Sequence, residues 1–83
     1  MKPYTVLLQA RVVRDLSAME STEVERFWRF VADLEANPFV DGDFEDSVED
    51  VRVKAKVLGT HSILFAVDHP MREVKVLCIL RSD

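Results

Sequence analysis

The chain has one cysteine among its 83 residues, which excludes an internal disulfide framework. Cys78 lies within an apolar run, and we expect it to be a small core residue of a protein that stays in a reducing compartment. No apolar run approaches the ~20 residues that a membrane-spanning helix needs, and no signal-peptide pattern opens the chain. These absences favour a soluble protein of the cytoplasm.

Glycine and metal-ligating residues are also scarce. Two glycines cannot build a phosphate-cradling loop, and one cysteine with two histidines offers no zinc pattern. Alternating acids after Asp41 resemble the start of a calcium loop. However, Asp46 stands where the glycine of an EF-hand belongs, and Arg52 stands where its bidentate glutamate belongs. We therefore expect no metal and no other cofactor.

The net charge of −4 is unevenly distributed. The segment from Asp41 to Asp50 is rich in acids and has no base, whereas the rest of the chain has more bases than acids. The local field therefore decides the choice of partner more than the net charge does. We expect Phe39 to Asp50 to be a solvated polar loop, which could also fold back and screen basic residues.

The periodicity of apolar residues predicts the order of the elements. Tyr4 to Leu8 has the β-branched and aromatic content of a strand, and from about Ala10 the apolar residues recur at helical spacing. The segment Thr22 to Glu25 is a capping-box pattern that begins a second helix, in which Thr22 is the cap. Asn37-Pro38 ends that helix.

Three strand-like runs fill the remainder: Val51 to Leu58, Ile63 to Val67, and Val74 to Arg81. The pattern predicts one α+β domain over residues 1–83 in the order β-α-α-β-β-β. Its helical hairpin covers one face of a four-stranded sheet and leaves the other face open. Phe30 is off the apolar stripe of its helix, so we expect it to be exposed. The predicted core consists of Phe27, Trp28, Val31, Leu34, Leu64, Phe65, Val67, Val76 and Cys78.

Arg52, Lys54 and Lys56 alternate along one predicted strand. Side chains at this spacing share a face at intervals of about 7 Å, close to the spacing of successive phosphates. Arg81 in the last strand could share that face. Such a group binds a polyanion and stabilises charge on a phosphoryl transition state. The alternative is that these bases only prevent edge-to-edge aggregation of an outer strand.

Histidine is the side chain type that most often carries protons near neutral pH. His61 follows a turn into the third predicted strand and could face the open side of the sheet, as a proton carrier or in a purely structural role. His69 precedes Pro70, and we expect it to lie in a hairpin turn.

Several motifs occur in an order that resembles the RelE/ParE superfamily of toxins from type II toxin–antitoxin modules, which stabilise plasmids or chromosomes. They are Arg14-Asp15-Leu16, Leu34-x-x-Asn37-Pro38, Gly42-Asp43, and the strand pair Ile63 to Asp68 and Val74 to Leu77. The resemblance implies a mostly antiparallel sheet with the first strand beside the last. It also implies an antitoxin partner that wraps around the toxin.

The RelE branch inhibits translation by cleaving mRNA in the ribosomal A site. The resemblance implies a catalytic set of Arg52, Lys54, Arg81 and His61, and an RNA-binding set of Arg52, Lys54, Lys56, Lys75 and Arg81. His61 or Ser62 stands where the family has a further base, and the family's late tyrosine or histidine has no counterpart after Arg81. We therefore expect weak or absent cleavage. The alternatives are a non-enzymatic ParE-like inhibitor of DNA gyrase and a degenerate, non-toxic protein-binding module.

Overall fold

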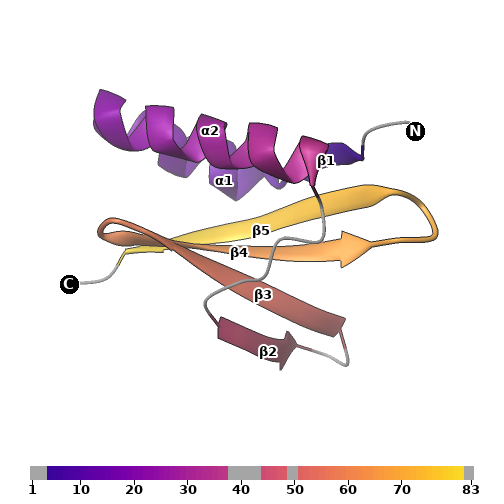
Figure 1. Cartoon of the computed structure of the whole chain (residues 1–83). Coiled ribbons are helices and arrows are strands. Elements are labelled where there is room, and N and C mark those ends of the chain that lie inside the picture. The colour runs from indigo at the N-terminus through magenta and orange to yellow at the C-terminus, as the bar shows by residue number, and fades with distance from the viewer. Residues whose placement is uncertain (1–3, 38–43, 49–50, 82–83) are drawn as a thin grey trace.

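The computed structural model describes residues 4–37, 44–48 and 51–81, with only the backbone of 44–48 and 51. Five strands form one sheet in the order β1-β5-β4-β3-β2, and two helices lie on one side of it (Figure 1). No helix in the described part of the chain is long and apolar enough to cross a membrane. The elements are β1 (Thr5–Leu8), α1 (Ala10–Ser17), α2 (Ser21–Ala36), β2 (Phe44–Val48), β3 (Val51–Leu58), β4 (His61–Asp68) and β5 (Glu73–Arg81).

The sheet is mostly antiparallel and has the first strand beside the last, as the resemblance implied. β1 pairs in parallel with β5, so the first strand lies beside the last, whereas the other neighbouring strands are antiparallel. The helical hairpin carries the chain from β1 at one edge of the sheet to β2 at the opposite edge, and the antiparallel strands β2 to β5 then lead back to β1. The α+β class and the helical hairpin on one face are confirmed.

The sheet has one strand more than the four expected from the sequence. Phe44–Val48 forms β2 and pairs antiparallel with β3, so the expectation of a polar loop is wrong for these residues. The backbone groups on the outer edge of β3 need hydrogen-bond partners whatever the side chains are, and β2 supplies them. The rest of that acidic segment, residues 38–43 and 49–50, lies outside the described residues.

The second helix begins earlier than the capping-box pattern predicts. Glu20 occupies the N-cap position and Ser21 is the first helical residue, so Thr22 lies inside the first turn and is not the cap. The backbone amides of Glu23 and Val24 donate to the carbonyl oxygen of Glu20, each at 3.0 Å. The predicted end is confirmed, since α2 stops at Ala36 and Asn37 is its C-cap.

The apolar stripe of α2 is rotated from its predicted position. Trp28 is 49% exposed and Phe30 only 5% exposed, so the expectations for these two residues are both wrong. Residues 27, 30, 31 and 34 follow the i, i+3, i+4, i+7 spacing of one helix face, which excludes position 28. Phe30 packs edge-to-face on Phe65 with ring centroids 5.4 Å apart, whereas the half-exposed Trp28 makes an edge-to-face pair with Phe27 at 5.3 Å.

A β-bulge in β5 explains why Cys78 is not in the core, and Leu64 is outside it because it alternates with Ile63 and Phe65 along β4. Leu64 pairs with Cys78, but the next residue, Phe65, pairs with Val76, so Leu77 is an extra residue. An extra residue reverses the alternation of faces beyond it. Ile79 therefore faces the helices, and Cys78 lies half-buried on the opposite face with Leu64.

The core lies between the helices and the sheet. Phe27, Val31, Leu34, Phe65 and Val76 are buried as predicted, and Val67 packs against them while partly exposed. The complete buried cluster consists of Val12, Leu16, Phe27, Phe30, Val31, Leu34, Ile63, Phe65, Val74, Val76 and Ile79.

We expect Phe65→Ala to destabilise the domain by about 3–5 kcal/mol, because its ring is fully buried at the centre of the core. Trp28→Ala is the matched control, and it should cost at most about 1.5 kcal/mol because half of its side chain is already in water. Urea unfolding followed by circular dichroism measures both values. Equal losses in the two variants would show that the rotation of α2 is misassigned.

Candidate basic site

The basic residues of β3 share one face, and it is the face that carries the helices. Lys54 pairs with Phe65 and Lys56 pairs with Ile63, so both lysines lie on the side of those two core residues. Arg52 shares that side because side chains alternate along a strand. Both lysines are half-buried and Arg52 is exposed. Figure 1 shows β3 further from the helices than β5.

Arg81 lies on the same side of the sheet but not close to the bases of β3. It pairs with His61 across β4 and β5, and the bulge puts it on the face of Ile79. β3 and β5 lie on either side of β4, so their backbones are separated by about 10 Å. Without the extra residue Leu77, Arg81 would point to the opposite face. Arg81 therefore shares a face with the β3 bases, as the sequence suggested, but it is two strands away from them.

His61 is held between β4 and α2 and does not face the open side of the sheet. It is 9% exposed, and its Nδ1 lies 2.5 Å from Glu23 Oε2 and 3.3 Å from Thr60 Oγ1. The expectation that His61 could face the open side of the sheet is therefore wrong. Alternation along β4 puts its side chain on the same face as Ile63 and Phe65, which is the face covered by the helices. The contact joins the first turn of α2 to the start of β4.

A small cavity of about 230 Å³ lies beside His61, between the end of α1 and the last residues of β5. It brings an acid, an imidazole and a guanidinium together from three elements. Asp15 belongs to one of the motifs on which the family resemblance depends, but its proximity to Arg81 was not predicted from the sequence. The cavity is lined by Asp15, Ala18, Met19, His61, Ile79 and Arg81.

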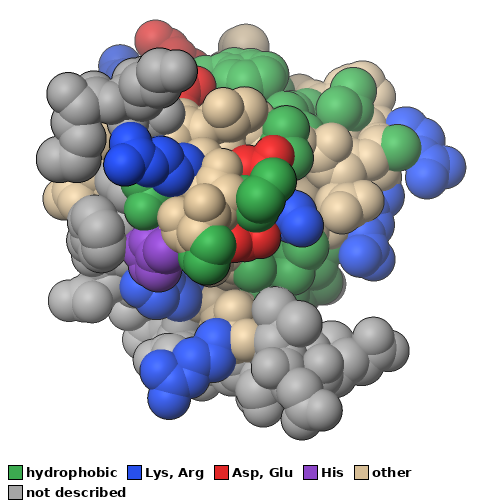
Figure 2. Space-filling model, turned by 90° about the vertical axis from the view of Figure 1, so that its right-hand side faces the viewer, with side chains coloured by type: hydrophobic (Ala, Val, Ile, Leu, Met, Phe, Trp, Pro, Cys, Tyr) green, Lys and Arg blue, Asp and Glu red, His purple; other side chains and the backbone are tan. Residues whose placement is uncertain are grey.

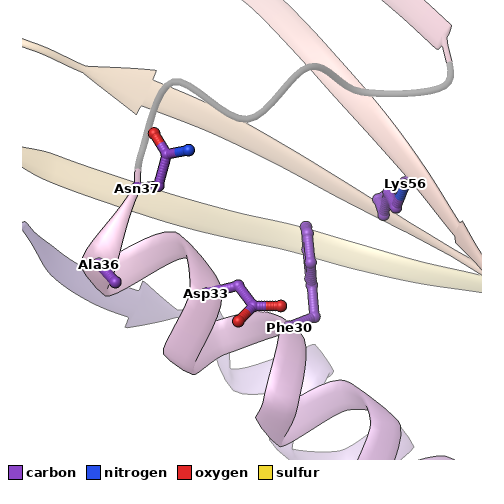
Figure 3. Close-up of a pocket in the computed structure, with 5 residues that line it drawn as sticks. All are labelled: Phe30, Asp33, Ala36, Asn37 and Lys56. Carbon is purple, nitrogen blue, oxygen red and sulfur yellow. The ribbon is translucent and has the colours of Figure 1, made fainter.

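A larger cavity of about 350 Å³ lies between the C-terminal half of α2 and β3 (Figure 3). Phe30 and Ala36 give it apolar surface, whereas Asp33, Asn37 and Lys56 supply polar groups. The sequence placed Lys56 among the basic residues but did not identify this cavity. Its signal is the spacing of residues 30, 33 and 37, which lie on one face of a helix.

Lys75 is separated from the other residues of the predicted RNA-binding set. It pairs with Ala66, whose neighbours Phe65 and Val67 pack toward the helices, so Lys75 lies on the opposite face of the sheet. Figure 2 shows the end of the molecule that carries the β4–β5 hairpin, where Lys and Arg side chains occur at several separate places. The predicted set is thus divided between two faces.

His69 lies in the exposed turn between β4 and β5, as predicted. Its Nδ1 lies 2.9 Å from the hydroxyl oxygen of Tyr4, and the two rings are edge-to-face with centroids 5.8 Å apart. This pair ties the residue before β1 to the β4–β5 hairpin. Within the described ranges, no group of three or more His, Cys, Asp or Glu residues is arranged to hold a metal ion.

No protein family model and no curated protein matches the sequence. Solved structures do match it. A chain of the archaeal RelE–RelB complex from Pyrococcus horikoshii superimposes with a TM-score of 0.83 and 20% identity, over 95% of this chain and 94% of that one. The toxin–antitoxin complex RelBE2 from Mycobacterium tuberculosis gives 0.79 and 24%, over 98% and 93%.

The isolated RelE toxin of E. coli matches with a TM-score of 0.79 and 13% identity, over 96% of this chain and 85% of that one. Identities this low show a common fold and carry no residue roles with them. The three matches cover 95–98% of this chain, so the arrangement of helices and sheet is shared. The chain has a RelE-like fold.

Proposed function

We propose that this protein is a toxin-like component of a type II toxin–antitoxin module. The protein acts in the cytoplasm and is silenced by an antitoxin. It affects translation by binding mRNA with little or no cleavage. The observation that carries the proposal is the row of Arg52, Lys54 and Lys56 on the helix-bearing side of β3. The RelE-like fold supports it, because the similar solved chains include RelE toxins and their complexes with antitoxins.

The spacing of this row suits a single RNA strand. Alternate residues of a strand lie about 7 Å apart, so three basic side chains can meet successive phosphates. Neutralising phosphates releases counterions and drives binding even when the protein as a whole is acidic. The register pairs Glu45 of β2 with Lys54, so the described part of the acidic segment, Phe44–Val48, runs beside the row. Its negative charge favours weak, salt-dependent binding.

The position of His61 argues against efficient cleavage. Cleavage at a 2′-hydroxyl requires a proton acceptor within hydrogen-bond reach of that hydroxyl, and a missing general base costs about 10²–10⁴-fold in rate. His61 is buried, and its Nδ1 faces Glu23 and Thr60. Arg81 lies two strands from the β3 row. His61, Arg81 and the row of β3 bases therefore do not converge on one phosphate. This arrangement is also compatible with the two non-enzymatic alternatives, a ParE-like gyrase inhibitor and a non-toxic protein-binding module.

Replacing the whole row by Arg52→Gln, Lys54→Gln and Lys56→Gln should weaken RNA binding and reduce its dependence on salt. Each lost phosphate contact lowers the slope of log affinity against log salt by about 0.7 for a single strand, so we expect a change of about 2 for the triple variant. Filter binding to a single-stranded RNA between low and moderate salt measures it.

The matched control is Lys75→Gln, which removes a base from the other face of the sheet and should leave the slope nearly unchanged. In growing cells, induction of the wild type should arrest growth, and co-expression of the neighbouring gene's product should relieve the arrest. Arrest with unaltered RNA binding in the triple variant would favour the gyrase target. Normal growth with no co-purifying partner would leave the non-toxic binding module.

Primer extension on translated mRNA after induction should show weak or no cuts in the A site. We expect Arg81→Ala to change the pattern little, because Arg81 is distant from the row of β3 bases. Total RNA from uninduced cells is the control for background breaks. Strong A-site cuts in the wild type that disappear in Arg81→Ala would contradict this proposal and identify a working nuclease.

His61→Ala should destabilise the domain by about 1–3 kcal/mol, because it leaves the buried Oε2 atom of Glu23 without its neighbour. Glu23→Ala should also destabilise it, and the double variant should lose less than the sum of the two single losses. His69→Ala, in the exposed turn, is the control and should cost less than about 1 kcal/mol. Strictly additive losses in chemical unfolding would show that His61 and Glu23 do not interact.

A further inference from the structure

We propose that the cavity between α2 and β3 is a subsite for a guanine base. The inference rests on the proposed function, because an RNA strand along the basic row of β3 would bring its bases to this cavity. Lys56 belongs to both features: it is the last base of the row and it lines the cavity. An RNA phosphate bound at Lys56 would therefore lie next to the cavity that receives the base.

The size of the cavity suits one base. Its volume of about 350 Å³ is at the lower end of the roughly 300–1,000 Å³ that small-molecule pockets span. Its residues come from the last two turns of α2 and from β3, two elements of the folded core. A site on such elements is held in place before a ligand binds, so less ordering is needed on binding.

The apolar part of the cavity is preorganised. Phe30 is 5% exposed, and its ring is held edge-to-face against Phe65 at 5.4 Å. Figure 3 shows this ring standing between the helix and the strands, with Asp33 beside it and Lys56 across the cavity. With so little of its surface exposed, the ring gives the cavity a fixed apolar wall rather than a face on which a base could stack.

The polar part of the cavity selects the base. An ionised carboxylate such as that of Asp33 only accepts hydrogen bonds, through two oxygens side by side. Guanine is the base whose pairing edge carries two adjacent donors, the ring N1–H and the exocyclic N2 amino group. Adenine, cytosine and uracil each present a single donor group next to an acceptor. Lys56 donates only, so it complements guanine O6 or a phosphate.

Nuclear magnetic resonance titration of the full-length protein with GMP, AMP, CMP and UMP at fixed salt tests the proposal. We expect GMP to shift the backbone amides of residues 30–37 and 56, with an affinity roughly 5- to 100-fold higher than the others, as a bidentate contact provides. Guanosine and adenosine, which have no phosphate, should show the same preference. Asp33→Asn should abolish it, because an amide cannot accept both hydrogen bonds.

The matched control is Glu35→Gln, which removes one negative charge from the same helix at an exposed position that does not line the cavity. It should keep the preference for GMP. Equal binding of all four nucleotides, no shift at the cavity, or an unchanged preference in Asp33→Asn would overturn the inference. The readout does not depend on toxicity: an absence of growth arrest with intact GMP preference would reject the proposed function alone.

Discussion

The packing of α2 on the sheet, centred on the edge-to-face contact of Phe30 and Phe65, determines the geometry of the rest of the molecule. It sets the rotation of the helix about its own axis, because only one orientation buries residues 27, 30, 31 and 34 together. In that orientation Glu23 reaches His61, and Asp33 and Asn37 border the cavity opposite Lys56. The polar sites near the two ends of α2 are therefore consequences of the contact between Phe30 and Phe65.

The bulge at Leu77 is the second constraint. Before it, Val74 and Val76 face the helices, and after it Ile79 and Arg81 do. The extra residue keeps an apolar side chain opposite Ile63 and at the same time puts the guanidinium of Arg81 next to His61. A regular strand would have buried Cys78 and turned Arg81 to the other face.

The order of the elements could be predicted from the sequence because the period of the apolar residues changes from two to 3.6 and back. The phase of each element could not be predicted in the same way. The apolar stripe of α2 is too broad to identify its centre, because it includes Phe27, Trp28, Phe30 and Val31. The pattern therefore predicts a buried Trp28 and an exposed Phe30, the reverse of what is observed. Residues 76–80 are all apolar, and alternation leaves no trace of a bulge in such a run. β2 was missed because its pairing depends on backbone groups of β3.

The same reasoning applies to the site. The shared face of Arg52, Lys54 and Lys56 depends only on local alternation, so it could be read from the sequence. The burial of His61 depends on which face of β4 meets α2, and the cavity depends on residues more than 18 positions apart, from Asn37 to Lys56. Neither follows from local spacing, because both require the position of the helix on the sheet.

The two ends of α2 are coupled by its rigidity. Glu23 and Asp33 are ten residues apart, or about 15 Å along the helix axis. A rotation of α2 that released His61 toward solvent would also move Phe30 out of the core and change the cavity beside Lys56. Exposing His61 in this way would therefore cost the burial of an aromatic ring, so the observed packing favours a buried His61. The RelE-like fold of this chain therefore keeps His61 buried at one end of α2 and the cavity beside Lys56 at the other.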